Sequence, residues 1–128
     1  MVSIGPNNAW AVGSYWKDGA YRGLTEHWDG SVWSVVRTPH PHVRLPGPRS
    51  VALNDSPLYS IDAAASNDVW AVGSFFDGHQ YQAQAEHWNG MKWRLSRTPE
   101  RGALLGVSAR SSRAWAVGSF FHRGGYRN

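Results

Sequence analysis

The fold is decided by the five-residue string Trp10-Ala11-Val12-Gly13-Ser14, which occurs three times in the 128 residues of the chain. It returns as Trp70-Ala71-Val72-Gly73-Ser74 and as Trp115-Ala116-Val117-Gly118-Ser119, and two aromatic residues follow each copy. Repetition at intervals of a few tens of residues is typical of chains that stack copies of one structural unit. The sequence therefore predicts an array of like units that bury their apolar sides against one another.

The similarity extends beyond the string, and it divides the chain. Residues 7–39 align with 67–99 without a gap, and a third copy follows after about 45 residues. We expect one propeller-like domain over residues 1–128. Its parts are a first repeat at 1–40, a Pro-rich loop at 41–57, a second repeat at 58–100 and a partial third repeat at 103–128. The loop has a proline density that sheet ladders do not tolerate, so we expect an irregular surface loop there.

Within a repeat, β-branched and aromatic runs alternate with turn residues, which predicts strands. In the second repeat the predicted strands are Leu58–Ala63, Val69–Phe76, Tyr81–Trp88 and Met91–Arg97. Asp29-Gly30 and Asn89-Gly90 predict two-residue type I′ hairpins between the last two strands of their repeats. Four short antiparallel strands per repeat predict an all-β fold made of four-stranded sheets of β-propeller type.

The terminal repeats are incomplete. The first begins with Val2–Ile4, and the third has predicted strands at Ala103–Ser108 and Trp115–Phe121 before Tyr126–Asn128. About two and a half blades cannot close a ring that needs roughly four to eight. We expect that the chain is part of a longer propeller, or that copies assemble into a homo-oligomer that completes one.

Composition excludes several classes of function. Hydrophobic residues make up 41% and charged residues 17%, which is typical of a globular chain, and no apolar run is long enough to cross a membrane. The net charge of +4 comes from scattered arginines without a basic cluster, so we expect no nucleic-acid partner. The absence of cysteine excludes disulfides and thiolate chemistry. The N-terminus carries no secretory signal, which leaves the compartment open.

Eight tryptophans are the most unusual feature of the composition, and all of them except Trp16 occupy matched positions in the repeats. The segments Asn67–Gly73 and Glu86–Trp93, with Asn7–Gly13 and Glu26–Trp33, resemble the Trp-rich β-propeller repeats of exported or surface proteins in actinomycetes and related bacteria. The run Asp29–Trp33 is loosely similar to the Asp-box of sialidase-type propellers, although it lacks the Ser or Thr before the Asp. The resemblance implies a propeller fold and an extracellular setting. It implies no particular activity.

The best candidates for ligand binding are aromatic residues at the ends of the second strands. Sugar rings stack on aromatic faces, and polar groups in the following loops would orient them. The predicted set is Trp16, Phe76 and Phe121 with Tyr21, Tyr81, Asp18, Asp77 and His79. The alternative is that the rings only cap the core between the sheets.

Other residue patterns carry weaker functional signals. His27 and His87 share one position in the repeat, which fits a metal or general-base role, but a buried histidine bonded to backbone explains the repetition as well. No Gly-x-Ser-x-Gly elbow is present, and we predict no catalytic residue, metal or cofactor. The leading hypothesis is a non-catalytic module that binds carbohydrate, as a lectin does, or protein. The alternative is a fragment of a glycan-active propeller hydrolase or lyase.

Overall fold

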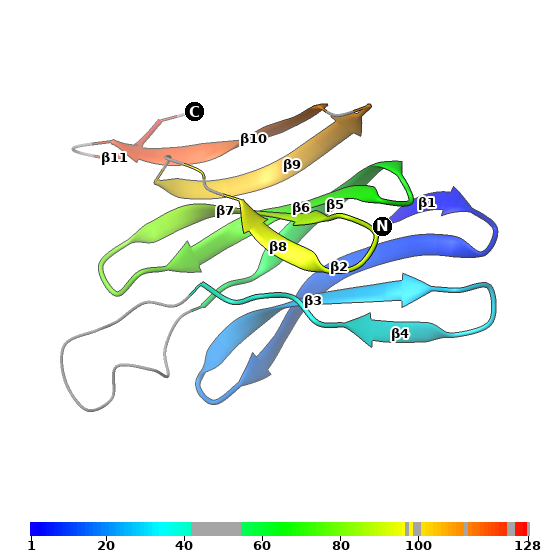
Figure 1. Ribbon diagram of the computed structural model, residues 1–128. Helices are drawn as coiled ribbons and strands as arrows, with labels where there is room; N and C mark the ends of the chain where they lie inside the picture. Colours follow the sequence, from blue (N-terminus) through cyan, green and yellow to red (C-terminus); the bar gives the residue numbers. More distant parts are fainter. Residues whose placement is uncertain (42–54, 97, 99–100, 112, 123–124, 128) are drawn as a thin grey trace.

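The computed structural model describes residues 1–41, 55–96, 98, 101–111, 113–122 and 125–127, and for 120–122 and 125–127 it describes the backbone alone. These residues form three antiparallel sheets (Figure 1). The first sheet contains β1 (Val2–Gly5), β2 (Asn8–Lys17), β3 (Ala20–Trp28) and β4 (Trp33–Val36). The second contains β5 (Leu58–Ala65), β6 (Asp68–Phe76), β7 (Tyr81–Trp88) and β8 (Trp93–Ser96). The third contains β9 (Gly102–Arg110), β10 (Arg113–His122) and β11 (Gly125–Arg127).

The all-β class and the four-stranded antiparallel sheets of the first two repeats are confirmed. Strand β7 has the predicted bounds, whereas β8 begins at Trp93 and not at Met91. Most of the predicted Pro-rich loop, residues 42–54, lies outside the described residues. Within the described parts of the chain, no helix is long and apolar enough to span a membrane.

The sheets are stacked in chain order, and the stack is open at both ends (Figure 1). Because side chains alternate along a strand, each sheet has a Trp face, which carries the first, third and fifth residues of its string, and an Ala face, which carries the second and fourth. The Trp face of the first sheet packs on the Ala face of the second, where Trp10 contacts Trp88 and Trp93. The Trp face of the second sheet contacts the third sheet. Asp62 is paired with Trp70 and lies on that face, and its Oδ2 accepts a hydrogen bond from the Ala109 amide.

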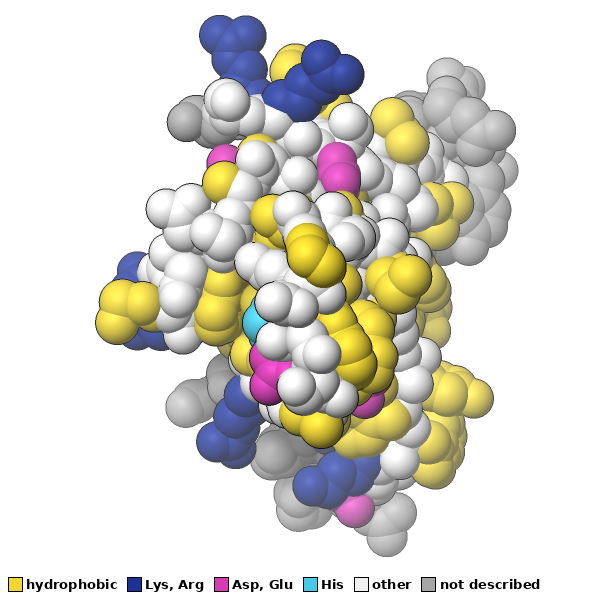
Figure 2. All heavy atoms as spheres, turned by 90° about the vertical axis from the view of Figure 1, so that its right-hand side faces the viewer, with side chains coloured by type: hydrophobic (Ala, Val, Ile, Leu, Met, Phe, Trp, Pro, Cys, Tyr) yellow, Lys and Arg dark blue, Asp and Glu magenta, His cyan; other side chains and the backbone are white. Residues whose placement is uncertain are grey.

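The best-buried core lies between the first two sheets. Trp10 is 2% exposed and packs there with Leu58, Val69, Ala71 and Trp93. Tryptophan contributes the largest apolar area of any residue, so one such side chain dominates the energy of a junction. Hydrophobic side chains nevertheless reach the surface on the side shown in Figure 2, so the stack leaves part of its apolar surface open to solvent.

The two predicted type I′ hairpins are present as hairpins, but the predicted turn type is wrong. Trp28 pairs with Trp33, and Trp88 with Trp93, so each loop has four residues. In each loop only the glycine has a positive φ, +102° at Gly30 and +96° at Gly90, whereas a type I′ turn needs two such residues. The first residue, Asp29 or Asn89, instead accepts hydrogen bonds through Oδ1 from the amides two and three residues ahead. This side-chain capping selects the longer loop.

The glycine of the repeated string is needed where a first strand bulges toward it. The pairing of β5 with β6 shifts between Leu58 and Ser60, and a Cβ built on Gly73 would overlap the carbonyl oxygen of Pro57. Gly118 has the same relation to the carbonyl oxygen of Ala103. At Gly13 no described atom lies within 4 Å of such a Cβ. The glycine of the string is therefore required by close backbone contact at Gly73 and Gly118 but not at Gly13.

We predict that Gly73→Ala lowers the free energy of unfolding by roughly 1 to 3 kcal/mol, because backbone must move to admit the methyl group. Gly13→Ala is the matched control and should stay within about 0.5 kcal/mol of the parent protein. Urea unfolding followed by tryptophan fluorescence measures both. Equal effects of the two substitutions would contradict the close approach at Gly73.

Candidate functional site

Two aromatic pairs lie at corresponding places in the first two sheets. Trp16 on β2 opposes Tyr21 on β3, and their rings meet edge to face with centroids 4.9 Å apart. Both are open to solvent, Trp16 at 62% and Tyr21 at 48%. Phe76 and Tyr81 form the corresponding pair of the second sheet, 5.3 Å apart and half-buried. The structure thus brings four predicted residues into two pairs, and the side chain of Phe121 lies outside the described part.

Asp55 joins the two pairs. Its Oδ1 accepts a hydrogen bond of 2.7 Å from the Tyr21 amide, and its Oδ2 accepts one of 3.2 Å from the Tyr81 hydroxyl. Its carbonyl oxygen also accepts a hydrogen bond from the Phe76 amide. One residue between the sheets therefore contacts both aromatic pairs and places a carboxylate beside them.

The segment 55–57 was predicted to belong to an irregular surface loop, and that prediction is wrong. Ser56 and Pro57 are buried. The Ser56 amide donates to the Tyr21 carbonyl, and Ser56 forms a parallel bridge with Arg22. This short extended segment connects the first sheet to the second just before β5 begins. Sequence reasoning missed Asp55 because it lies in an insertion without a counterpart in the other repeats.

The two Asp-Gly turns at the tips of these hairpins differ in type. Asp18 and Gly19 have φ values of +52° and +82°, and Lys17 pairs with Ala20, so this is the two-residue hairpin of type I′ geometry. Four residues separate the paired aromatics in each sheet, 17–20 in the first and 77–80 in the second, and Asp77-Gly78 lies one position earlier in its set than Asp18-Gly19. It gives a longer loop, in which Asp77 Oδ1 accepts from the amides of His79 and Gln80.

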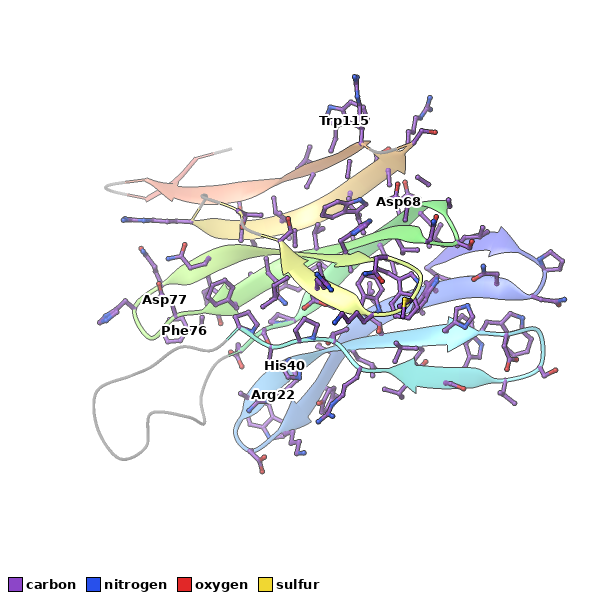
Figure 3. All side chains as sticks on the ribbon, in the orientation of Figure 1. Arg22, His40, Asp68, Phe76, Asp77 and Trp115 are labelled. Atoms are coloured by element: carbon purple, nitrogen blue, oxygen red, sulfur yellow. The ribbon has the colours of Figure 1, made fainter. Side chains whose placement is uncertain are left out.

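The Asp77 carboxylate is therefore engaged inside its own loop, and Gln82 Nε2 donates to its second oxygen at 2.7 Å. Burial alone would raise the pKa of Asp77, but the hydrogen bonds from Gln82, Gln80 and His79 outweigh it and hold that pKa below its ordinary value. Figure 3 shows Asp77 directly after Phe76 at the end of β6. His79 is exposed on the same loop.

A hollow of about 550 Å³ lies on the Ala face of the first sheet, and Asp18 is the predicted residue that lines it. Tyr15, Arg22 and Arg37 also line it. The corresponding hollow on the second sheet is smaller, about 210 Å³, and Pro41 occupies its wall beside Phe75. Because Tyr15 and Trp16 point to opposite faces of β2, the hollow and the exposed aromatic pair are separate surfaces.

The two repeated histidines have structural partners. His27 Nε2 lies 2.8 Å from Asn8 Oδ1, and His87 Nε2 lies 2.7 Å from Asp68 Oδ1. Each ring also contacts the string tryptophan of its own sheet, at 4.6 Å for His27 and 4.5 Å for His87. The alternative of a buried histidine bonded to backbone is thus wrong in detail, because the rings are half-buried and bond to side chains.

One carboxyl group is fully enclosed between the sheets. Glu86 is buried on the Ala face of the second sheet, where its Oε1 accepts a hydrogen bond of 2.7 Å from Gln84 Nε2. Its Oε2 has no partner among the described residues. Burial raises the pKa of Glu86 to about 7, and the hydrogen bond from Gln84 offsets only part of that rise.

The arrangement at the sheet junction offers aromatic rings and a carboxylate, which suit recognition of a polar ligand with apolar faces. Within the described residues, no group of three or more His, Asp or Glu side chains could hold a metal ion. Comparisons with protein-family models, with curated proteins and with solved structures found no match to this chain.

We predict that Asp55→Ala lowers the free energy of unfolding by roughly 1 to 3 kcal/mol, since it removes hydrogen bonds to both sheets. Tyr81→Phe removes only the hydroxyl partner and should cost less than Asp55→Ala. Thermal unfolding followed by circular dichroism measures both variants. A neutral Asp55→Ala would mean that the carboxylate does not hold the sheets together.

The raised pKa of Glu86 predicts that the stability of the protein depends on pH. Between its unfolded pKa near 4.5 and its folded value of about 7, the folded state holds a proton that the unfolded state has released. Stability must therefore fall as pH rises through this window, by roughly 3 kcal/mol in total. Glu86→Gln should remove that slope and be the more stable protein at pH 8.

Glu26 occupies the same repeat position on the first sheet, where it is only half-buried. Glu26→Gln is therefore the control, and it should leave the slope in place. Urea unfolding at a series of pH values distinguishes the two variants. A slope that survives Glu86→Gln would assign the pH dependence to another group.

Proposed function

We propose that the three sheets are successive blades of a β-propeller. Each sheet is a meander in sequence order, and the Trp face of the first packs on the Ala face of the second. The first strands β1, β5 and β9 contact each other in turn, which is the relation of innermost strands around a propeller axis. Hydrogen bonds from β9 amides to Ser60 and Asp62 link two of these strands.

We further propose that the chain is a non-catalytic binding module whose ligand is a carbohydrate. The observation that carries this proposal is the exposed edge-to-face pair of Trp16 and Tyr21 next to the Asp55 carboxylate. The apolar face of a sugar would stack on the indole ring, and a sugar hydroxyl would donate to a free lone pair of Asp55. Each carboxylate oxygen accepts one hydrogen bond from the residues that the structure describes, and a carboxylate oxygen can accept a second.

The alternative is a glycan-active hydrolase or lyase, and most glycoside hydrolases need two carboxyl groups that flank the bond to be cleaved. Glu86 has the raised pKa of a general acid, but it is enclosed between sheets and out of reach of a sugar. Asp62 and Asp77 are engaged by hydrogen bonds of the chain. The positions of these acids favour binding without catalysis. The family resemblance suggests an extracellular setting for such a module.

We predict that the protein binds members of a glycan array and that Trp16→Ala reduces binding to the best glycan by at least about tenfold. Trp115→Ala is the matched control, because Trp115 is another exposed tryptophan but lies on the third sheet. Calorimetric titration with that glycan measures both variants. An array without any bound sugar, or a Trp16→Ala variant that binds normally, would overturn the carbohydrate proposal and leave a protein ligand as the alternative.

A further inference from the structure

The junction between the first two sheets consists of a Trp face packed on an Ala face. The two ends of the stack expose one face of each kind. Trp10 is 2% exposed in the first sheet, whereas Trp115, the same residue of the string, is 56% exposed in the third. Figure 3 shows Trp115 pointing away from the other two sheets. At the other end, Trp33 is 42% exposed, whereas its counterpart Trp93 is 4% exposed. An exposed Trp face therefore lies at one end and an exposed Ala face at the other.

The exposed Ala face already has the geometry of the occupied one. In the second sheet, Trp88 and Trp93 lie 5.9 Å apart at 50°, and Trp10 contacts them at 5.0 and 5.4 Å. In the first sheet, Trp28 and Trp33 lie 5.7 Å apart at 44°. The receiving pair is thus formed without an occupant, so little ordering is needed for a third indole to bind.

We propose that a second copy of this chain docks head to tail, with its Trp115 inserted against Trp28 and Trp33 of the first copy. The occupant is a copy because the strings around Trp10 and Trp115 are identical in sequence and because the contact would extend the stack already present within the chain. Such an interface is heterologous, and it leads to a closed ring or to an open filament. Two copies of three sheets each would supply a number of blades within the roughly four to eight of closed propellers.

Charge supports the same register. In the existing junction, Asn8 lies two residues before Trp10 and lines a hollow with Trp88 and Gly90. Arg113 lies two residues before Trp115 and is exposed. Transposed to the proposed junction, Arg113 would face the loop that contains Gly30, next to the exposed carboxylate of Asp29. Opposite charges at these positions favour the head-to-tail register over other contacts.

The test is the molecular mass of the full chain in solution, measured by sedimentation equilibrium over a wide range of concentration. We expect the parent protein to associate, and we expect Trp115→Ala and Trp33→Ala each to weaken association by at least about tenfold. Arg113→Glu is a further variant on the docking side, at an exposed position where folding is not at risk, and it should weaken association too. Trp16→Ala, which removes an exposed tryptophan outside the junction, should not.

A mixing experiment tests the head-to-tail arrangement itself. Trp115→Ala retains the receiving pair, and Trp33→Ala retains the inserted tryptophan, so the two variants together can still form one intact junction. We expect the mixture to form a one-to-one complex that neither variant forms alone. Circular dichroism of each variant shows whether it is folded before mixing.

A parent protein that stays monomeric at all concentrations would overturn the proposal. That result is expected if further repeats of a longer chain, and not a second copy, cover these faces. A mixture that stays dissociated while the parent associates would also overturn it, because the mixture retains one intact head-to-tail junction. Head-to-tail docking requires the stacking of the sheets and no sugar ligand. The glycan experiment can therefore fail or succeed independently of this one.

Discussion

The packing of one tryptophan against a pair of others holds the first two sheets together. Trp10 leaves its own sheet and packs against Trp88 and Trp93 of the next, with Val69 and Ala71 beneath it. A single meander of four strands is not stable alone, because it would expose an apolar face to water. Each sheet is therefore stabilised by its neighbour, and the repeated string supplies side chains for that packing.

The segment that joins the first two sheets is positioned by backbone contacts as well as by indole rings. The bulge at the start of β5 brings the Pro57 carbonyl against Gly73, and the Ser74 amide donates to that carbonyl at 3.2 Å. Asp55, two residues earlier, then reaches back to the first sheet through the Tyr21 amide. The glycine without a side chain and the carboxylate with two acceptor oxygens thus hold the segment 55–57 against both sheets, and the exposed aromatic pair lies beside it.

Sequence reasoning succeeded where the repeat supplied two independent readings of one position. The strands followed from matched alternation in two copies, and Tyr81–Trp88 was placed without error. It failed where the outcome depends on a single atom. Whether an Asp-Gly pair gives a two-residue or a four-residue turn depends on one step of register, as Asp18 and Asp77 show, and on whether Oδ1 caps the following amides. Asp55 was missed because an insertion offers no second copy to compare.

The ends of the stack follow from the same logic as its middle. A repeat unit carries a donating face and a receiving face whether or not a neighbour is present, so an open array must expose one of each. Trp28 and Trp33 have nearly the mutual geometry of Trp88 and Trp93, although within the described residues no third indole packs on them. The receiving site is therefore a property of the hairpin itself, imposed by the pairing of Trp28 with Trp33 across β3 and β4. A surface that is formed before its occupant arrives loses little entropy on binding, which is why complementary ends of a repeat favour association over exposure to water.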